Sequence, residues 1–112
     1  MFVEPFINEK ILQLTTYIKA VIDRSIHVTE LDKLLWDILE EWSDLNVTDD
    51  TPLNSQERVF WHLIHELKLH GAQSLQNDIT FKTEMKTCLD FLDGQGSYPI
   101  DCIGWRPILS KS

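Results

Sequence analysis

One stretch of the chain combines residue types that could bind a metal ion. His62, His65 and Glu66 stand at positions i, i+3 and i+4, and His70 follows one helical turn later. Side chains at these spacings are neighbours on a helix, and zinc accepts imidazole and carboxylate ligands. The order His-Leu-Ile-His-Glu differs, however, from the His-Glu-x-x-His arrangement of zinc proteases, and no second cluster of Cys or His supplies a further ligand. We therefore predict solvated side chains here, with no metal site and no cofactor.

Candidates for acid–base or nucleophilic catalysis are equally weak. Ser25, His27 and Glu30 lie close together in the sequence, but this is typical of a helix start, where such side chains cap backbone N–H groups. Glu40 and Glu41 point in different directions on a helix and so do not form an acid–base pair. The sequence also lacks a nucleophile elbow, a phosphate-binding glycine loop and a dinucleotide-binding fingerprint. The chain is thus predicted not to be an enzyme.

The most unusual feature of the sequence is a concentration of acidic residues. The whole chain has 18 acidic and 10 basic residues and a formal net charge of −8. Seven carboxylates fall between Leu34 and Glu57, a window without Lys or Arg, which leaves 11 acidic and 10 basic residues elsewhere. The seven are Asp37, Glu40, Glu41, Asp44, Asp49, Asp50 and Glu57. Such a field attracts cationic partners and repels nucleic acid and anionic membranes, so the expected partner is basic.

The acidic window could also be no more than a solvated helix face, because charged residues usually fill such a face. A solvated face commonly mixes both signs, since Glu and Lys four residues apart stabilise a helix. Here positions 37 and 41, and positions 40 and 44, carry like charges, and each pair costs about 0.2–0.5 kcal/mol. This repulsion favours a functional acidic surface over a merely solvated one.

Length and composition are those of one globular domain. The chain has 112 residues, 43% of them hydrophobic and 10% aromatic, which predicts a single domain of residues 1–112 with its own core. No apolar run approaches the roughly 18 residues of a membrane span, and the N-terminus lacks a secretory signal pattern. Cys88 and Cys102 are too few for a disulfide scaffold, and we interpret them as reduced core thiols. These features predict a cytoplasmic protein.

Apolar residues recur at spacings of three and four in four segments, which predicts four helices. The helices are expected from about Pro5 to Asp23, from an N-cap at Thr29 to Leu45, from an Asn54–Glu57 capping box to Gly71, and from Thr80 to Gly94. Residues 97–109 contain two prolines, which preclude a regular helix there. The predicted fold is all-α, an antiparallel bundle of about four helices with an extended C-terminal strap.

The second predicted helix separates an apolar face from an acidic one. On a helical wheel, the carboxylates of residues 37–44 lie opposite an apolar stripe that includes Trp42. Trp36 projects off this stripe, so it could either seal a gap in the fold or contact a partner, as Trp often does at interfaces. Tyr98 and Trp105 in the strap are expected to be packed. The predicted partner-binding residues are Trp36, Asp37, Glu40, Glu41, Asp44, Asp49 and Asp50.

Several segments together form a pattern that extends over roughly the first two-thirds of the chain. They are the end of the first helix at residues 17–23, Ile26 with the Thr29-Glu30-Leu31 helix start, the acidic stretch from Trp36 to Asp50, and the Ser55–Trp61 helix segment. In this pattern of helix lengths and charge, the chain resembles the small acidic immunity proteins of bacterial toxin–immunity pairs, of the colicin and contact-dependent growth inhibition type. The resemblance implies a protein that binds one cognate toxin domain, often a cytotoxic nuclease, and blocks its active site or substrate groove.

Other functions are compatible with the same residues. A nucleic-acid mimic, such as an anti-restriction protein, would use the same charge but needs a longer, evenly spaced array of carboxylates. A regulatory or adaptor module would have an acidic face that is merely solvated, and a metal-dependent enzyme would retain zinc on purification. A nuclease surface must be positive to hold phosphates, so an inhibitor with carboxylates in phosphate-like positions matches it well. The sequence therefore favours an immunity protein whose partner is a basic toxin domain.

Overall fold

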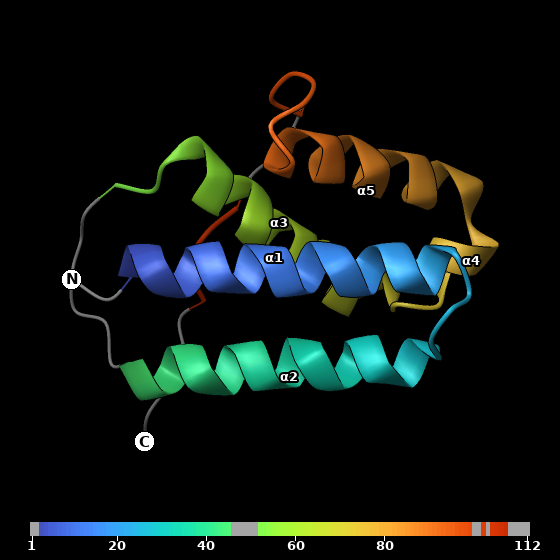
Figure 1. Ribbon diagram of the computed structural model, residues 1–112, viewed down its shortest axis with the longest axis horizontal. Helices are drawn as coiled ribbons and strands as arrows, with labels where there is room; N and C mark the ends of the chain where they lie inside the picture. Colours follow the sequence, from blue (N-terminus) through green and yellow to red (C-terminus); the bar gives the residue numbers. More distant parts are fainter. Residues whose placement is uncertain (1–2, 46–51, 100–101, 103, 108–112) are drawn as a thin grey trace.

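The described part of the protein contains five helices (Figure 1). The computed structural model describes residues 3–45, 52–99, 102 and 104–107. The helices are α1 (Val3–Ile22), α2 (Val28–Leu45), α3 (Ser55–His70), α4 (Ser74–Asn77) and α5 (Ile79–Leu92). No strand occurs in these ranges, and the all-α prediction is confirmed. None of the helices found there combines the length and the apolar character that a membrane span requires.

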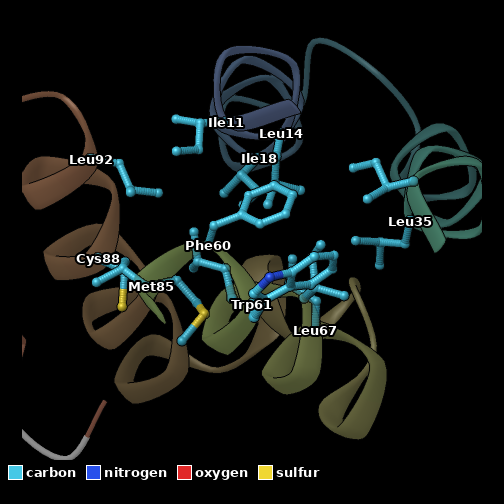
Figure 2. Close-up of a cluster of buried hydrophobic side chains, with 14 of the residues drawn as sticks. Ile11, Leu14, Ile18, Leu35, Phe60, Trp61, Leu67, Met85, Cys88 and Leu92 are labelled. Carbon is cyan, nitrogen blue, oxygen red and sulfur yellow. The ribbon is translucent and has the colours of Figure 1, made fainter. Parts of the chain in front are cut away.

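The four long helices are arranged around α1 (Figure 1). α2 lies on one side of α1 and α5 on the other, both antiparallel to it, and α3 passes obliquely behind it. Figure 2 shows the four helices surrounding one apolar cluster, with Phe60 and Trp61 of α3 in its middle. The predicted antiparallel bundle is confirmed.

Local capping chemistry fixes the ends of α3 and α5. The side chain of Asn54 accepts a hydrogen bond from the backbone N–H of Glu57 at 2.8 Å, so the predicted start of α3 is confirmed. Gly71, at φ 88°, ends α3 as predicted. At α5, however, the N-cap is Asp78, whose carboxylate accepts from the N–H of Phe81 at 3.1 Å. The helix therefore begins just before the predicted position.

Two local predictions differ from the structure. α2 begins at Val28, and Thr29 lies in its first turn, where its N–H donates to the ring Nδ1 of His27 at 3.2 Å. Thr29 is therefore not the N-cap. The segment between the third and fourth predicted helices, for which no helix was predicted, contains the short helix α4, which buries Leu75 completely. A single apolar residue in a short polar segment gives no periodicity, and this is why α4 could not be predicted.

Large aromatic side chains fill the space between α2 and α3. Trp42 is buried as predicted, and its ring lies edge-on to that of Trp61, with 5.0 Å between the ring centroids. The ring of Phe60 also lies 4.8 Å from that of Trp61, which is only 1% exposed. The α2 and α3 backbones approach each other less closely than those of α1 and α2. A groove opens at the surface between α2 and α3.

The described residues of the C-terminal strap have no helix or strand, as predicted, and Cys102, Gly104 and Arg106 lie against α3. Gly104 approaches α3 so closely that an added Cβ would stand 1.7 Å from the carbonyl oxygen of Arg58. Only glycine fits there. The Sγ of Cys102 lies 3.8 Å from the same oxygen. The strap is thus packed directly onto the α3 backbone.

A buried ion pair joins Arg106 of the strap to Glu57 of α3. The carboxylate of Glu57, which is 4% exposed, accepts hydrogen bonds from Nε and Nη2 of Arg106 at 2.7 and 3.0 Å. It also accepts from Nε1 of Trp61 at 3.0 Å. The side chain of Glu57 therefore does not complete a capping box with Asn54. Glu57 belongs to the interior, although the sequence places it in the acidic window.

Candidate protein-binding surface

The outer face of α2 carries the predicted binding residues that the structure describes. Leu31, Leu35 and Ile38 are buried against the rest of the bundle, and this orientation turns the opposite side of α2 to solvent. The exposed side has Trp36, Asp37, Glu40, Glu41 and Asp44. We call these five residues the α2 outer face. Asp49 and Asp50, also predicted to bind, lie outside the described residues.

The carboxylates of the α2 outer face differ in their surroundings. Glu41 pairs with Lys10 of α1, whose Nζ lies 2.9 Å from Oε1 of Glu41 and whose side chain is buried. This contact ties α2 to α1 and neutralises the charge of Glu41 locally. Asp37, Glu40 and Asp44 form no ion pair with any other described residue. They supply the uncompensated negative charge of the face.

Trp36 is presented to solvent and does not seal a gap in the fold. Its side chain is 64% exposed. The Nζ of Lys68, on α3, lies 3.7 Å from the ring centroid in a cation–π contact. Lys68 lies 32 positions farther along the chain, so local pattern in the sequence could not have found this neighbour. The contact holds the indole at the edge between α2 and α3.

A groove of about 430 Å³ opens beside Trp36, between α2, α3 and the strap. We call it the α2–α3 groove. Its lining is Leu39, Trp61, Ile64, His65, Lys68, Leu69, Trp105 and Pro107. Leu69 is 66% exposed and Trp105 is 68% exposed. Trp105 was predicted to be packed, which is wrong, because the strap turns its indole outward while neighbouring Gly104 and Arg106 contact α3.

Tyr98, the other aromatic residue of the strap, is only partly packed. Its ring lies edge-on to Phe91 at 5.5 Å, and its hydroxyl donates to the carbonyl oxygen of Cys102 at 3.3 Å. The residue as a whole is nevertheless exposed. Tyr98 therefore packs through one side of its ring only.

The histidines of α3 do not converge on a common point. His70 pairs with Glu66, with 3.6 Å between Nε2 and Oε1, and its ring also lies 5.0 Å from that of Phe81. Burial lowers the pKa of His62, which favours its neutral form. Within the described residues, no three His, Cys, Asp or Glu side chains lie close enough together to hold a metal ion.

Both cysteines are free and buried, which confirms their interpretation as reduced core thiols. Burial raises the pKa of the Cys88 thiol from its usual 9.0 to about 12. At a pH at which the thiol already ionises in the unfolded chain, it therefore stays protonated in the folded protein.

This shift predicts alkaline sensitivity that depends on Cys88. The folded state retains a proton that the unfolded state loses above about pH 9, so the free energy of unfolding should fall as the pH rises from there toward about 12. Cys88→Ala should flatten that fall. Urea unfolding of both proteins at neutral and alkaline pH would measure it, and equal slopes would contradict the prediction.

Comparisons with known proteins find no match to this chain among protein-family models, curated proteins or solved structures. The structural observation that bears on function is the surface formed by the α2 outer face and the α2–α3 groove.

Proposed function

We propose that this protein is an immunity protein that acts in the cytoplasm. It would bind a cognate toxin domain, which is a nuclease with a basic surface. The α2 outer face would cover the active site or substrate groove of the toxin. One observation carries the proposal. Trp36 stands exposed beside Asp37, Glu40 and Asp44, none of which is ion-paired within the described part of the chain.

The chemistry of a nuclease surface explains why these residue types fit. A nuclease holds phosphates with Lys and Arg, so carboxylates on an inhibitor can occupy the same positions. Long-range attraction between the two surfaces accelerates association, while desolvated aromatic residues and close charge pairs slow dissociation. Trp36 and the three carboxylates beside it supply both components on one helix.

The exposed apolar residues favour immunity over nucleic-acid mimicry. A mimic of a phosphate backbone needs carboxylates over a long, regular surface, whereas here Trp36, Leu69 and Trp105 lie next to the charged face. Large exposed aromatic side chains are typical of the energetic centre of a protein–protein interface. This combination supports binding to one specific protein partner.

The partner can be identified by purifying the tagged protein from the cells that produce it. We expect one basic protein in stoichiometric amount, with a toxic activity that the purified chain inhibits. Retention of several unrelated DNA-binding enzymes would instead indicate mimicry, and retention of a non-toxic partner would indicate an adaptor.

Charge reversal then tests the α2 outer face. Glu40→Lys with Asp44→Lys should lower the association rate constant with this partner by about 10-fold or more at low salt and weaken its salt dependence. Glu84→Lys with Asp90→Lys is the matched control, since both residues are exposed on α5, on the opposite side of α1 (Figure 1). It changes the net charge equally. Equal effects of the two double variants, measured by stopped flow, would exclude the α2 outer face as the binding surface.

A further inference from the structure

The α2–α3 groove lies directly beside the α2 outer face, and nothing in the described residues fills it. We propose that the α2–α3 groove binds an amphipathic helix of the basic partner, an inference that rests on the proposed function. The helix places an apolar stripe in the groove and its Lys and Arg residues along α2. The partner is thereby held through an apolar anchor as well as through charge.

Several exposed apolar side chains lie close together at this groove. Seven large hydrophobic side chains are exposed among the described residues, and three of them, Trp36, Leu69 and Trp105, surround or extend this groove. Trp36 adjoins it because Lys68, a lining residue, lies over the indole. Scattered exposed apolar residues are ordinary, whereas a contiguous apolar patch with a polar rim is typical of a binding site.

The length of the groove matches a bound helix. Its lining residues on α3 recur over three successive turns, from Trp61 through Ile64 to Leu69. At 1.5 Å per residue this is about 12 Å along the helix axis. Apolar residues at positions i and i+7 of a bound helix are about 10.5 Å apart. A helix that presents apolar residues at i, i+3, i+4 and i+7 fits this length, and helices bind in grooves through such residues.

The two sides of the groove differ in charge. Leu39 is the α2 residue that lines the groove, and the outer face of α2 beyond it carries Glu40, one turn from Trp36, and Asp44, one turn later. On α3 the rim has His65 and Lys68, and Lys68 forms no ion pair with a described residue. A helix with basic residues along one flank only is attracted in one orientation, with that flank toward α2.

A synthetic peptide tests this assignment without the natural partner. The probe is a helical peptide of about 18 residues, long enough to be helical in water, with Leu at i, i+3, i+4 and i+7 and Lys along one flank. Two reference peptides replace either the Leu residues by Ala or the Lys residues by Glu. Binding is measured by calorimetry against the whole chain. We expect the Leu–Lys peptide to bind and both reference peptides to bind at least about 10-fold more weakly.

Variants of the chain locate the binding site. Leu69→Ala with Trp105→Ala should weaken binding of the Leu–Lys peptide about 10-fold or more. Leu12→Ala with Ile79→Ala is the matched control, because these side chains are 69% and 73% exposed but do not line the groove. The control should leave the affinity unchanged. Circular dichroism of each variant checks that the fold is intact. Equal weakening by both double variants, or by neither, would overturn the proposal.

The oligomeric state of the free protein tests whether a second copy of the chain occupies the groove. In sedimentation of the free protein, we expect no dimer that depends on Trp105, that is, no dimer that the Trp105→Ala substitution dissociates. Such a dimer would assign the groove to self-association and overturn the proposal.

Kinetics with the natural partner separate the groove from the α2 outer face. The groove variants should raise the dissociation rate constant. If charge reversal on α2 slows association but the groove variants leave dissociation unchanged, the proposed function stands and the groove assignment fails. If the peptide binds in the groove but charge reversal has no effect on the partner, the proposed function fails.

Discussion

Replacement of Arg106 by Ala should destabilise the protein by about 3–5 kcal/mol, because it leaves the carboxylate of Glu57 buried without its guanidinium. The hydrogen bond from Nε1 of Trp61 to Glu57 would remain, but it carries no positive charge to balance the carboxylate. The guanidinium also lies 6.0 Å from the ring of Trp42, so the substitution removes packing together with charge. Urea unfolding at neutral pH measures the loss.

The control is an ion pair of the same length at the surface. Lys19 and Asp93 approach to 2.7 Å, like Arg106 and Glu57, but both side chains are substantially exposed. Lys19→Ala should cost only about 0.2–1 kcal/mol, because water screens the pair and solvates the remaining carboxylate. Comparable losses of stability in the two variants would contradict the prediction that burial makes the Glu57–Arg106 pair more important than a surface pair.

A double variant separates the charge of Glu57 from the packing of the strap. Glu57→Gln keeps an acceptor for Trp61 and removes the negative charge, so in the Arg106→Ala background it should restore part of the lost stability. The coupling between the two substitutions should be about 0.5–3 kcal/mol, the range for residues in one network. Additive losses would mean that Arg106 stabilises the fold through packing alone.

The sequence was sufficient to predict the features that depend on residues close together in the chain. The four long helices follow from apolar periodicity, and the start of α3 follows from Asn54, whose side chain caps the helix as expected. The exposure of Asp37, Glu40 and Asp44 follows from the same periodicity, since it fixes which side of α2 is buried. These features need no knowledge of the rest of the chain.

The sequence could not predict contacts between segments far apart in the chain. Glu57 looked like a surface carboxylate in an acidic window, yet it is buried because Arg106, 49 positions later, meets it. Glu41 likewise is tied to Lys10, 31 positions before it. The groove has the same origin, because it forms only where α2, α3 and the strap meet. Whether Trp105 faces in or out depends on how the strap docks, which no local pattern encodes.

The tryptophans provide the second large prediction, because the same residue type has opposite surroundings at positions 61 and 36. Trp61→Ala should cost about 3–5 kcal/mol, since it removes a side chain that is 1% exposed and packed against Trp42 and Phe60. It also removes one hydrogen-bond donor to Glu57. Trp61→Phe keeps most of the ring and should cost less, which separates the cavity from the lost donor.

Trp36→Ala should change the stability by no more than about 1 kcal/mol, the energy of its exposed cation–π contact with Lys68. Its effect should appear in complex formation, where a central Trp can contribute about 2 kcal/mol or more, because the partner would bury the indole as the core buries Trp61. Urea unfolding of the two Ala variants, followed by binding measurements on the stable one, tests both statements. If Trp36→Ala destabilises the protein as much as Trp61→Ala does, the indole of Trp36 is needed for folding. Trp36 could then no longer be assigned to the proposed interface.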